Sequence, residues 1–142
     1  MKKRDVFLLL SLVLFSVSFT FLLRADPDSH FITGYVHNAT DGKSPNGMKV
    51  IAYRPGTLSD NVTDIIGPDG NSGTSNEYLI DCQLLQSPCM VGDIITIRAP
   101  LQRGYFAGPV NVTVTAAGFD VAPDMTLSKA RRNHCRSSPT CR

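Results

Sequence analysis

Apolar and polar residues alternate along most of the chain from residue 31 onward, a period of two that is typical of half-buried β-strands. The pattern is clearest in residues 76–82. There Tyr78, Ile80 and Cys82 fall on one side of an extended chain, and the charged side chains fall on the other. This segment is predicted to be a strand with one face in a hydrophobic core.

A second strand is expected shortly afterwards, at residues 94–97, because every residue there is β-branched and disfavours a helix. Residues 76–98 are therefore predicted to form a hairpin. Cys82 and Cys89 lie in its connection, and their spacing lets the chain fold back and join them in a disulfide. Closing so short a loop would stabilise the fold by roughly 2–3 kcal/mol. Two buried free thiols are the alternative.

Other segments show strand patterns too and are separated by turns rich in glycine, proline and asparagine. They cover residues 31–37, 48–54, 59–66, 110–115 and 125–127. About seven strands over roughly one hundred residues, at this turn spacing, predict an all-β fold, a seven-stranded antiparallel Greek-key sandwich.

The N-terminal part of the chain has a different pattern, an apolar run without charge at residues 6–23. The run is longer than a signal-peptide core of about 7–15 residues and lies at the short end of what spans a bilayer, so a cleaved signal peptide and a retained anchor both fit. Basic residues 2–4 would stay in the cytoplasm, which leaves the rest facing outward, membrane-anchored or secreted. The predicted regions are residues 1–25, a hydrophobic helix that is signal peptide or membrane anchor; residues 26–30, a stalk; residues 31–128, the β-sandwich; and residues 129–142, a basic tail with cysteines.

Charge divides the exported part in two. Residues 26–128 hold five basic and eleven acidic residues, a net charge of −6, whereas residues 129–142 hold five basic residues and no acidic one. The net charge of +2 for the whole chain therefore gives no reason to expect a nucleic-acid partner.

The basic tail is suited to contact with a glycan or an anionic surface such as a lipid headgroup layer, although a solvated, disordered end fits the same composition. Cys135 and Cys141 bring the cysteine count to four. In an exported chain an even count predicts a second disulfide, between these two residues. A zinc site is disfavoured because the chain has no C-x-x-C pair.

Several short motifs lie at the turns and strand starts of the predicted sandwich. They are Gly34-Tyr35-Val36, Asp41–Gly47 followed by Met48–Val50, Glu77–Ile80, and Val91–Asp93 followed by Ile94–Ile97. Together they resemble the carboxypeptidase regulatory-like, transthyretin-like (prealbumin-like) domains over approximately residues 31–128. The resemblance implies a transthyretin- or Ig-like Greek-key sandwich, a non-enzymatic module of cell-surface or secreted proteins without catalytic residues.

Glycosylation is predicted at three Asn-x-Thr sequons, whose asparagines are Asn38, Asn61 and Asn111. In an exported protein each of these can accept a glycan if its side chain faces solvent. Asn and Thr are also ordinary residues of turns and strand surfaces, so the sequons by themselves leave an unmodified surface open.

Residues 69–73, Asp-Gly-Asn-Ser-Gly, have the alternating oxygen-bearing residues with which a calcium loop begins. Ile80 occupies the twelfth position, where an EF-hand needs a bidentate glutamate, and helical flanks are not predicted. A solvated polar loop is therefore favoured over a calcium site. We expect no metal and no cofactor.

No catalytic motif is found, and the histidines are scattered, so we do not expect an enzyme. The predicted function is a non-catalytic extracytoplasmic β-sandwich module in cell-surface structure, adhesion or assembly, with a sheet edge as a surface for a protein partner. The alternative is a carbohydrate-binding module. Its candidate ligand contacts are Tyr53, Tyr105 and Phe106, in a chain that has no tryptophan.

Overall fold

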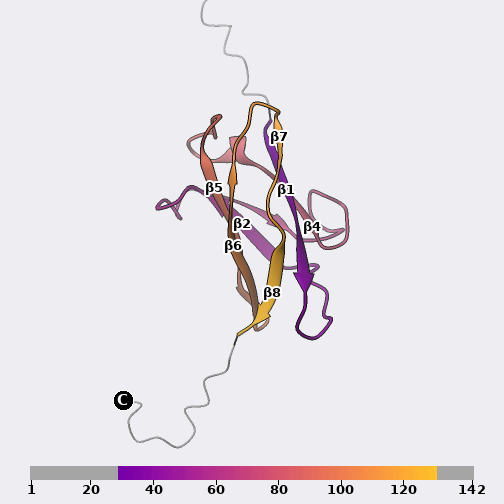
Figure 1. Ribbon diagram of the computed structural model, residues 1–142. Coiled ribbons are helices and arrows are strands. Elements are labelled where there is room, and N and C mark those ends of the chain that lie inside the picture. Colours follow the sequence, from indigo (N-terminus) through magenta and orange to yellow (C-terminus); the bar gives the residue numbers. More distant parts are fainter. Residues whose placement is uncertain (1–28, 131–142) are drawn as a thin grey trace, which may run out of the picture.

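The computed structural model describes residues 29–130, and within them the chain is all-β, as predicted (Figure 1). The strands are β1 (Phe31–Asn38), β2 (Lys49–Tyr53), β3 (Asn61–Ile65), β4 (Glu77–Asp81), β5 (Ile94–Gln102), β6 (Tyr105–Thr113), β7 (Phe119–Val121) and β8 (Met125–Lys129), with one turn of 3₁₀ helix, η1 (Cys82–Leu84). No helix in the described part has the length and hydropathy that a membrane crossing requires. The predicted N-terminal helix lies outside the described residues, as do Cys135 and Cys141.

The strands form one sheet that nearly closes on itself. Their order is β3-β2-β5-β6-β8-β1-β4, and β7 pairs with β1. The two ends of this order meet, since the backbone N–H of Gly67, just after β3, donates to the carbonyl of Glu77 in β4 at 2.8 Å. The closed shape lets one core be covered from both sides.

The sheet has eight strands and is mixed, where seven antiparallel strands were expected. β7 and β8 both run parallel to β1. They are two parts of one extended segment that follows β1. Thr33 is paired with Val121 and Val36 with Met125, so three steps along β1 correspond to four steps along this segment, which has one extra residue between β7 and β8. Pro123 lies in that gap and has no N–H to donate, which divides the segment into two short strands.

The predicted hairpin over residues 76–98 is wrong. β4 pairs with β1, and β5 pairs with β2 and β6, so the chain between the two cysteines crosses from one half of the sheet to the other. The tight hairpin is β5–β6, whose turn residues Arg103 and Gly104 have φ values of 51° and 84°. Two positive φ values are typical of the two-residue turns that suit the twist of paired strands.

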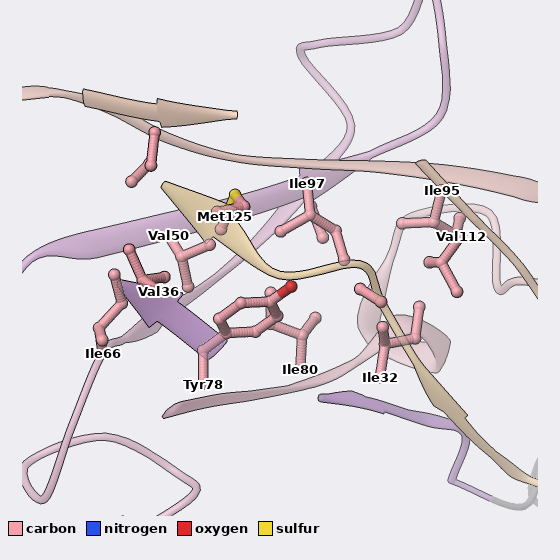
Figure 2. Close-up of a cluster of buried hydrophobic side chains, with 14 of the residues drawn as sticks. Ile32, Val36, Val50, Ile66, Tyr78, Ile80, Ile95, Ile97, Val112 and Met125 are labelled. Carbon is pink, nitrogen blue, oxygen red and sulfur yellow. The ribbon is translucent and has the colours of Figure 1, made fainter. Parts of the chain in front are cut away.

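One hydrophobic core fills the space between the two halves of the sheet. Tyr78, Ile80 and Cys82 are all fully buried, which confirms the predicted inward face of this segment. Figure 2 shows ten labelled members of the core, which come from strands of both halves. They are Ile32, Val36, Val50, Ile66, Tyr78, Ile80, Ile95, Ile97, Val112 and Met125.

Candidate functional surfaces

Tyr105, a candidate ligand contact, is buried where β6 begins. Its hydroxyl donates a hydrogen bond to the Asp41 carboxylate, and the ammonium groups of Lys43 and Lys129 lie 5.7 and 5.9 Å from its ring centroid. The bond to Asp41 raises the pKa of Tyr105, and the same bond, with one from Asn38, lowers the pKa of Asp41. Tyr105 therefore joins the β1–β2 connection to the end of β8, and little of its ring is open to a sugar.

The other two candidate contacts lie far from each other. Tyr53 is on the outer side of β2, with the guanidinium carbon of Arg98 5.7 Å from its ring centroid. Phe106 is 41% exposed, but as the neighbour of Tyr105 on a strand it points to the opposite face. Tyr53 on β2 is level with Asn111 on β6, because both are paired with Thr96 of β5. Phe106 is five residues from Asn111 along β6, a separation of roughly 17 Å. The structure does not bring the three rings together into one platform.

Two of the three sequons share one face of the sheet. Asn61 is paired with Tyr53, Tyr53 with Thr96, and Thr96 with Asn111, so these four residues form a row across β3, β2, β5 and β6. Both asparagines are exposed. We call the outer side of these four strands the sequon face. The side-chain oxygen of Asn111 accepts a bond from Thr96 at 2.8 Å, which leaves its amide nitrogen directed away from that contact.

Asn38 has a different setting, at the end of β1. Its amide nitrogen donates to Asp41 at 2.9 Å and to the carbonyl of Lys43 at 2.7 Å, and its oxygen accepts from the backbone N–H of Thr40 at 2.9 Å. The side chain thus organises the β1–β2 connection. A glycan here would have to replace hydrogens that are already bonded.

The opposite layer carries an exposed apolar surface that the sequence analysis did not select. Phe31 and Tyr35 on β1 are 36% and 39% exposed, and Phe119 and Val121 on β7 are 48% and 64% exposed. The parallel register pairs Phe31 directly with Phe119, and Thr33, between the two β1 aromatics, with Val121. All four side chains lie on the outer side of these strands. We call this surface, Phe31, Tyr35, Phe119 and Val121, the aromatic face.

The free edge of β4 is covered by its own chain. The N–H of Leu79 donates to the Asp64 carboxylate at 2.8 Å, and the carbonyl of Leu79 accepts from the Asn71 amide at 3.1 Å. Gly67 and Ser72 both donate to the carbonyl of Glu77. A partner strand would have to displace these contacts before it could pair with β4. The sheet-edge partner stays a prediction.

The loop with the calcium-like sequence serves this covering role. The backbone N–H of Asn71 donates to the buried Asp64 at 3.0 Å, whereas Asp69 is exposed to solvent. Within residues 29–130, no group of three or more His, Cys, Asp or Glu side chains is arranged to hold a metal ion. The carboxylate that organises the loop is Asp64, which comes from β3 and not from the motif.

The Cys82–Cys89 disulfide is present, with its two Cα atoms 5.6 Å apart. Arg54 supports the same loop from the side of β2, because its guanidinium donates to the carbonyls of Ser87 and Pro88 at 2.6 and 2.9 Å. It also binds the Asp93 carboxylate at 2.7 Å. Hydrogen bonds from Arg54 and from the N–H of Met90 lower the pKa of Asp93. The loop is therefore fixed at both ends.

Comparisons of the chain with protein-family models, with curated proteins and with solved structures gave no match. The transthyretin-like resemblance therefore stays a prediction.

Proposed function

We propose that this chain is a non-catalytic extracytoplasmic β-sandwich module that acts in cell-surface structure, adhesion or assembly. The aromatic face is the surface through which it binds a protein partner, either another copy of the chain or a neighbouring surface protein. The observation that carries this proposal is the difference between the two outer faces of the domain. One presents four exposed apolar side chains on the paired strands β1 and β7. The other presents two sequons together with the exposed apolar residues Ile94, Leu101 and Phe106.

Exposed apolar side chains that adjoin one another are typical of surfaces that other proteins cover. Phe31 and Phe119 are cross-strand partners, and Val121 and Tyr35 extend the patch along the two strands. Tyr35 is also stacked on His37, with the ring centroids 6.3 Å apart. Ring stacking holds the tyrosine in place, which lowers the entropy lost when a partner binds.

A Greek-key, transthyretin-like relationship is part of this proposal. It is supported by where the motifs lie in the sheet, since Gly34 is inside β1 and Val91–Asp93 lead directly into β5. Contact of the basic tail with a glycan or an anionic surface, and retention of residues 1–25 as an anchor, are further parts of the proposal that follow from composition.

The alternative of a carbohydrate-binding module has less support. Sugar binding by stacking needs aromatic rings that face one ligand. Tyr105 is buried, and Tyr53 and Phe106 lie roughly 17 Å apart on the sequon face. A glycan array tests it directly. Binding that is lost in a Phe106→Ala or Tyr53→Ala variant would favour this alternative over a protein partner.

Site-specific photocrosslinking tests the protein partner. The full chain carries a photoreactive phenylalanine at position 35, on the aromatic face, or at position 49 as the control. Lys49 is exposed on the outer side of β2, and its side chain takes no part in the core. We expect a discrete crosslinked product from position 35 and none from position 49. Equal crosslinking at both positions, or none at either, would contradict the proposal.

A further inference from the structure

One end of the sandwich gathers three segments that are distant in sequence. The backbone N–H of Phe31 donates to the carbonyl of Gly118 at 3.1 Å. The N–H of Cys82 donates to the carbonyl of His30 at 3.0 Å, and the N–H of Gly92 donates to the carbonyl of Val114 at 2.9 Å. Figure 1 shows the start of β1, the β6–β7 connection and the loop before β5 at this end, and the last residues of β8 at the opposite end. Ser29, the first residue that the structure describes, also lies at this end, next to His30.

The disulfide loop at this end displays apolar side chains to solvent. Leu84, Met90 and Val91 are 71%, 70% and 68% exposed, the highest values among the large hydrophobic residues that the structure describes. The segment from Cys82 to Gly92 contains no charged residue. This loop is therefore an exposed apolar part of a domain that has a net negative charge over residues 26–128.

The loop is also held rigidly from within. The disulfide closes one side, Arg54 binds the carbonyls of Ser87 and Pro88 from the other, and the Gln83 amide donates to the Cys89 carbonyl at 3.0 Å. These contacts prevent the loop from turning its apolar side chains toward the core. The fold therefore keeps Leu84 and the Met90–Val91 pair exposed although their exposure to water is unfavourable.

We propose that this apolar loop, defined by Leu84, Met90 and Val91, rests in the lipid interface of the bilayer that holds the N-terminal segment. The apolar run of residues 6–23 is separated from Ser29 by only five residues, which reach about 17 Å when extended. An anchor embedded there would hold this end of the domain at the membrane surface. Exposed apolar side chains are suited to the headgroup and acyl boundary, and the charged groups that bind the loop backbone, Arg54, Asp60 and Asp93, can stay in the headgroup layer.

The opposite end of the sandwich has a different composition. Asp41, Lys43, Arg103 and Lys129 lie there, joined by the Tyr105 contacts and by the hydrogen bond from Ala130 to Gly104. Because the exposed apolar loop lies at one end, the domain would stand on the membrane with its strands rising from it. Three side chains bind lipid too weakly to attach a protein alone, so the loop sets orientation while the anchor supplies attachment.

The inference rests on the proposed outward-facing, membrane-anchored location, but not on assembly through the aromatic face. The absence of tryptophan allows a direct test, since one introduced tryptophan is the only indole in the chain. Leu84→Trp and Met90→Trp report on the loop. Leu101→Trp is the matched control, because Leu101 is 64% exposed and lies beside the turn at the opposite end.

Each full-length variant, its mass showing that residues 1–28 are retained, is reconstituted into phosphatidylcholine nanodiscs under oxidising conditions. We expect the emission of the two loop tryptophans to shift to the blue and to be quenched by brominated acyl chains, while that of Leu101→Trp stays unquenched. Because the loop is uncharged, added salt or anionic lipid should leave the quenching unchanged. Contact through the basic tail would be weakened by salt.

Equal quenching at positions 84 and 101, or none at 84 and 90, would overturn the proposal. A blue shift of the loop tryptophans without quenching would also overturn it, because it would indicate a protein partner at the loop. None of these results bears on crosslinking at position 35, so the two proposals can fail separately.

Discussion

His30 and Asp120 form a buried hydrogen-bonded pair in which Nε2 of the histidine lies 2.6 Å from Oδ2 of the carboxylate. His30 directly precedes β1 and Asp120 is the middle residue of β7, so the pair joins the two strands that carry the aromatic face. Burial opposes ionisation of Asp120. Hydrogen bonds from the N–H and the hydroxyl of Thr115 and from His30 outweigh this effect and lower the pKa of Asp120.

Asp120→Asn should therefore destabilise the domain. The substitution removes the carboxylate charge to which His30 and Thr115 are bonded, and a hydrogen bond to a charged group contributes roughly 1.5–3 kcal/mol. Because the native pKa of Asp120 lies below its unfolded value, the stabilisation is present above about pH 4 and is lost as the pH falls through the native value. Urea unfolding of the full chain at several pH values measures both effects.

Asp124→Asn is the control for that prediction. Asp124 binds His37 at 2.9 Å, and this second pair also joins β1 to the segment that contains β7 and β8. Unlike the first pair, it is exposed: the side chain of His37 is 57% exposed and that of Asp124 is 59% exposed. Exposed pairs contribute roughly 0–1 kcal/mol. An Asp124→Asn variant as unstable as Asp120→Asn would show that burial is not what gives the first pair its strength.

The disulfide should contribute to stability by a measurable amount. A Cys82→Ser, Cys89→Ser double variant, unfolded in parallel with the natural chain, is expected to lose roughly 2–3 kcal/mol. Intact mass with and without reductant counts the bridges and tests the predicted Cys135–Cys141 pair at the same time. If the double variant were as stable as the natural chain, Arg54 alone would be sufficient to hold the loop.

Glycan occupancy should differ among the sequons. We expect Asn111 to be modified more completely than Asn38. A glycan replaces one amide hydrogen, and on Asn38 this removes the bond to Asp41 or the bond to the Lys43 carbonyl, whereas the exposed amide of Asn111 can carry a glycan without such a loss. Glycopeptide mass spectrometry of the exported protein gives the occupancy of each site. Higher occupancy at Asn38 than at Asn111 would contradict this order.

The sequence was sufficient to predict the buried face of residues 76–82, but not which strands pair. Alternation reports directly on burial, and it placed Tyr78 and Ile80 correctly. Pairing depends on contacts between distant segments. Twelve residues separate β4 from β5, and a connection of that length can return to the same layer or cross to the other. The parallel pairing of β7 with β1 could not be predicted either, because a strand of three residues is too short to show an alternating pattern.

The candidate surface was predictable in part. The ligand contacts were selected by residue type, and type alone does not show that Tyr105 is enclosed by Asp41 and two lysines. The alternation of residues 31–37 does set Phe31 and Tyr35 opposite the buried Ile32, so half of the aromatic face could have been found. The other half comes from β7, which only the folded chain brings beside β1.

Tyr78→Phe should stabilise the domain. The Tyr78 hydroxyl is buried in the core and has no hydrogen-bond partner in the part of the chain that the structure describes, and burial raises its pKa. The hydroxyl occupies the space where Gly34 has no side chain. Phenylalanine keeps the ring packing and removes a desolvated polar group, so the free energy of unfolding should rise by about 1 kcal/mol.

Tyr105→Phe provides the opposite case with the same atomic change. Its hydroxyl is bonded to Asp41, so its removal should lower stability and allow the pKa of Asp41 to return toward its ordinary value. Urea unfolding of the two variants side by side separates a hydroxyl that lacks a partner from one that has one. If Tyr78→Phe were the less stable of the two, the core hydroxyl would have to be hydrogen-bonded in solution.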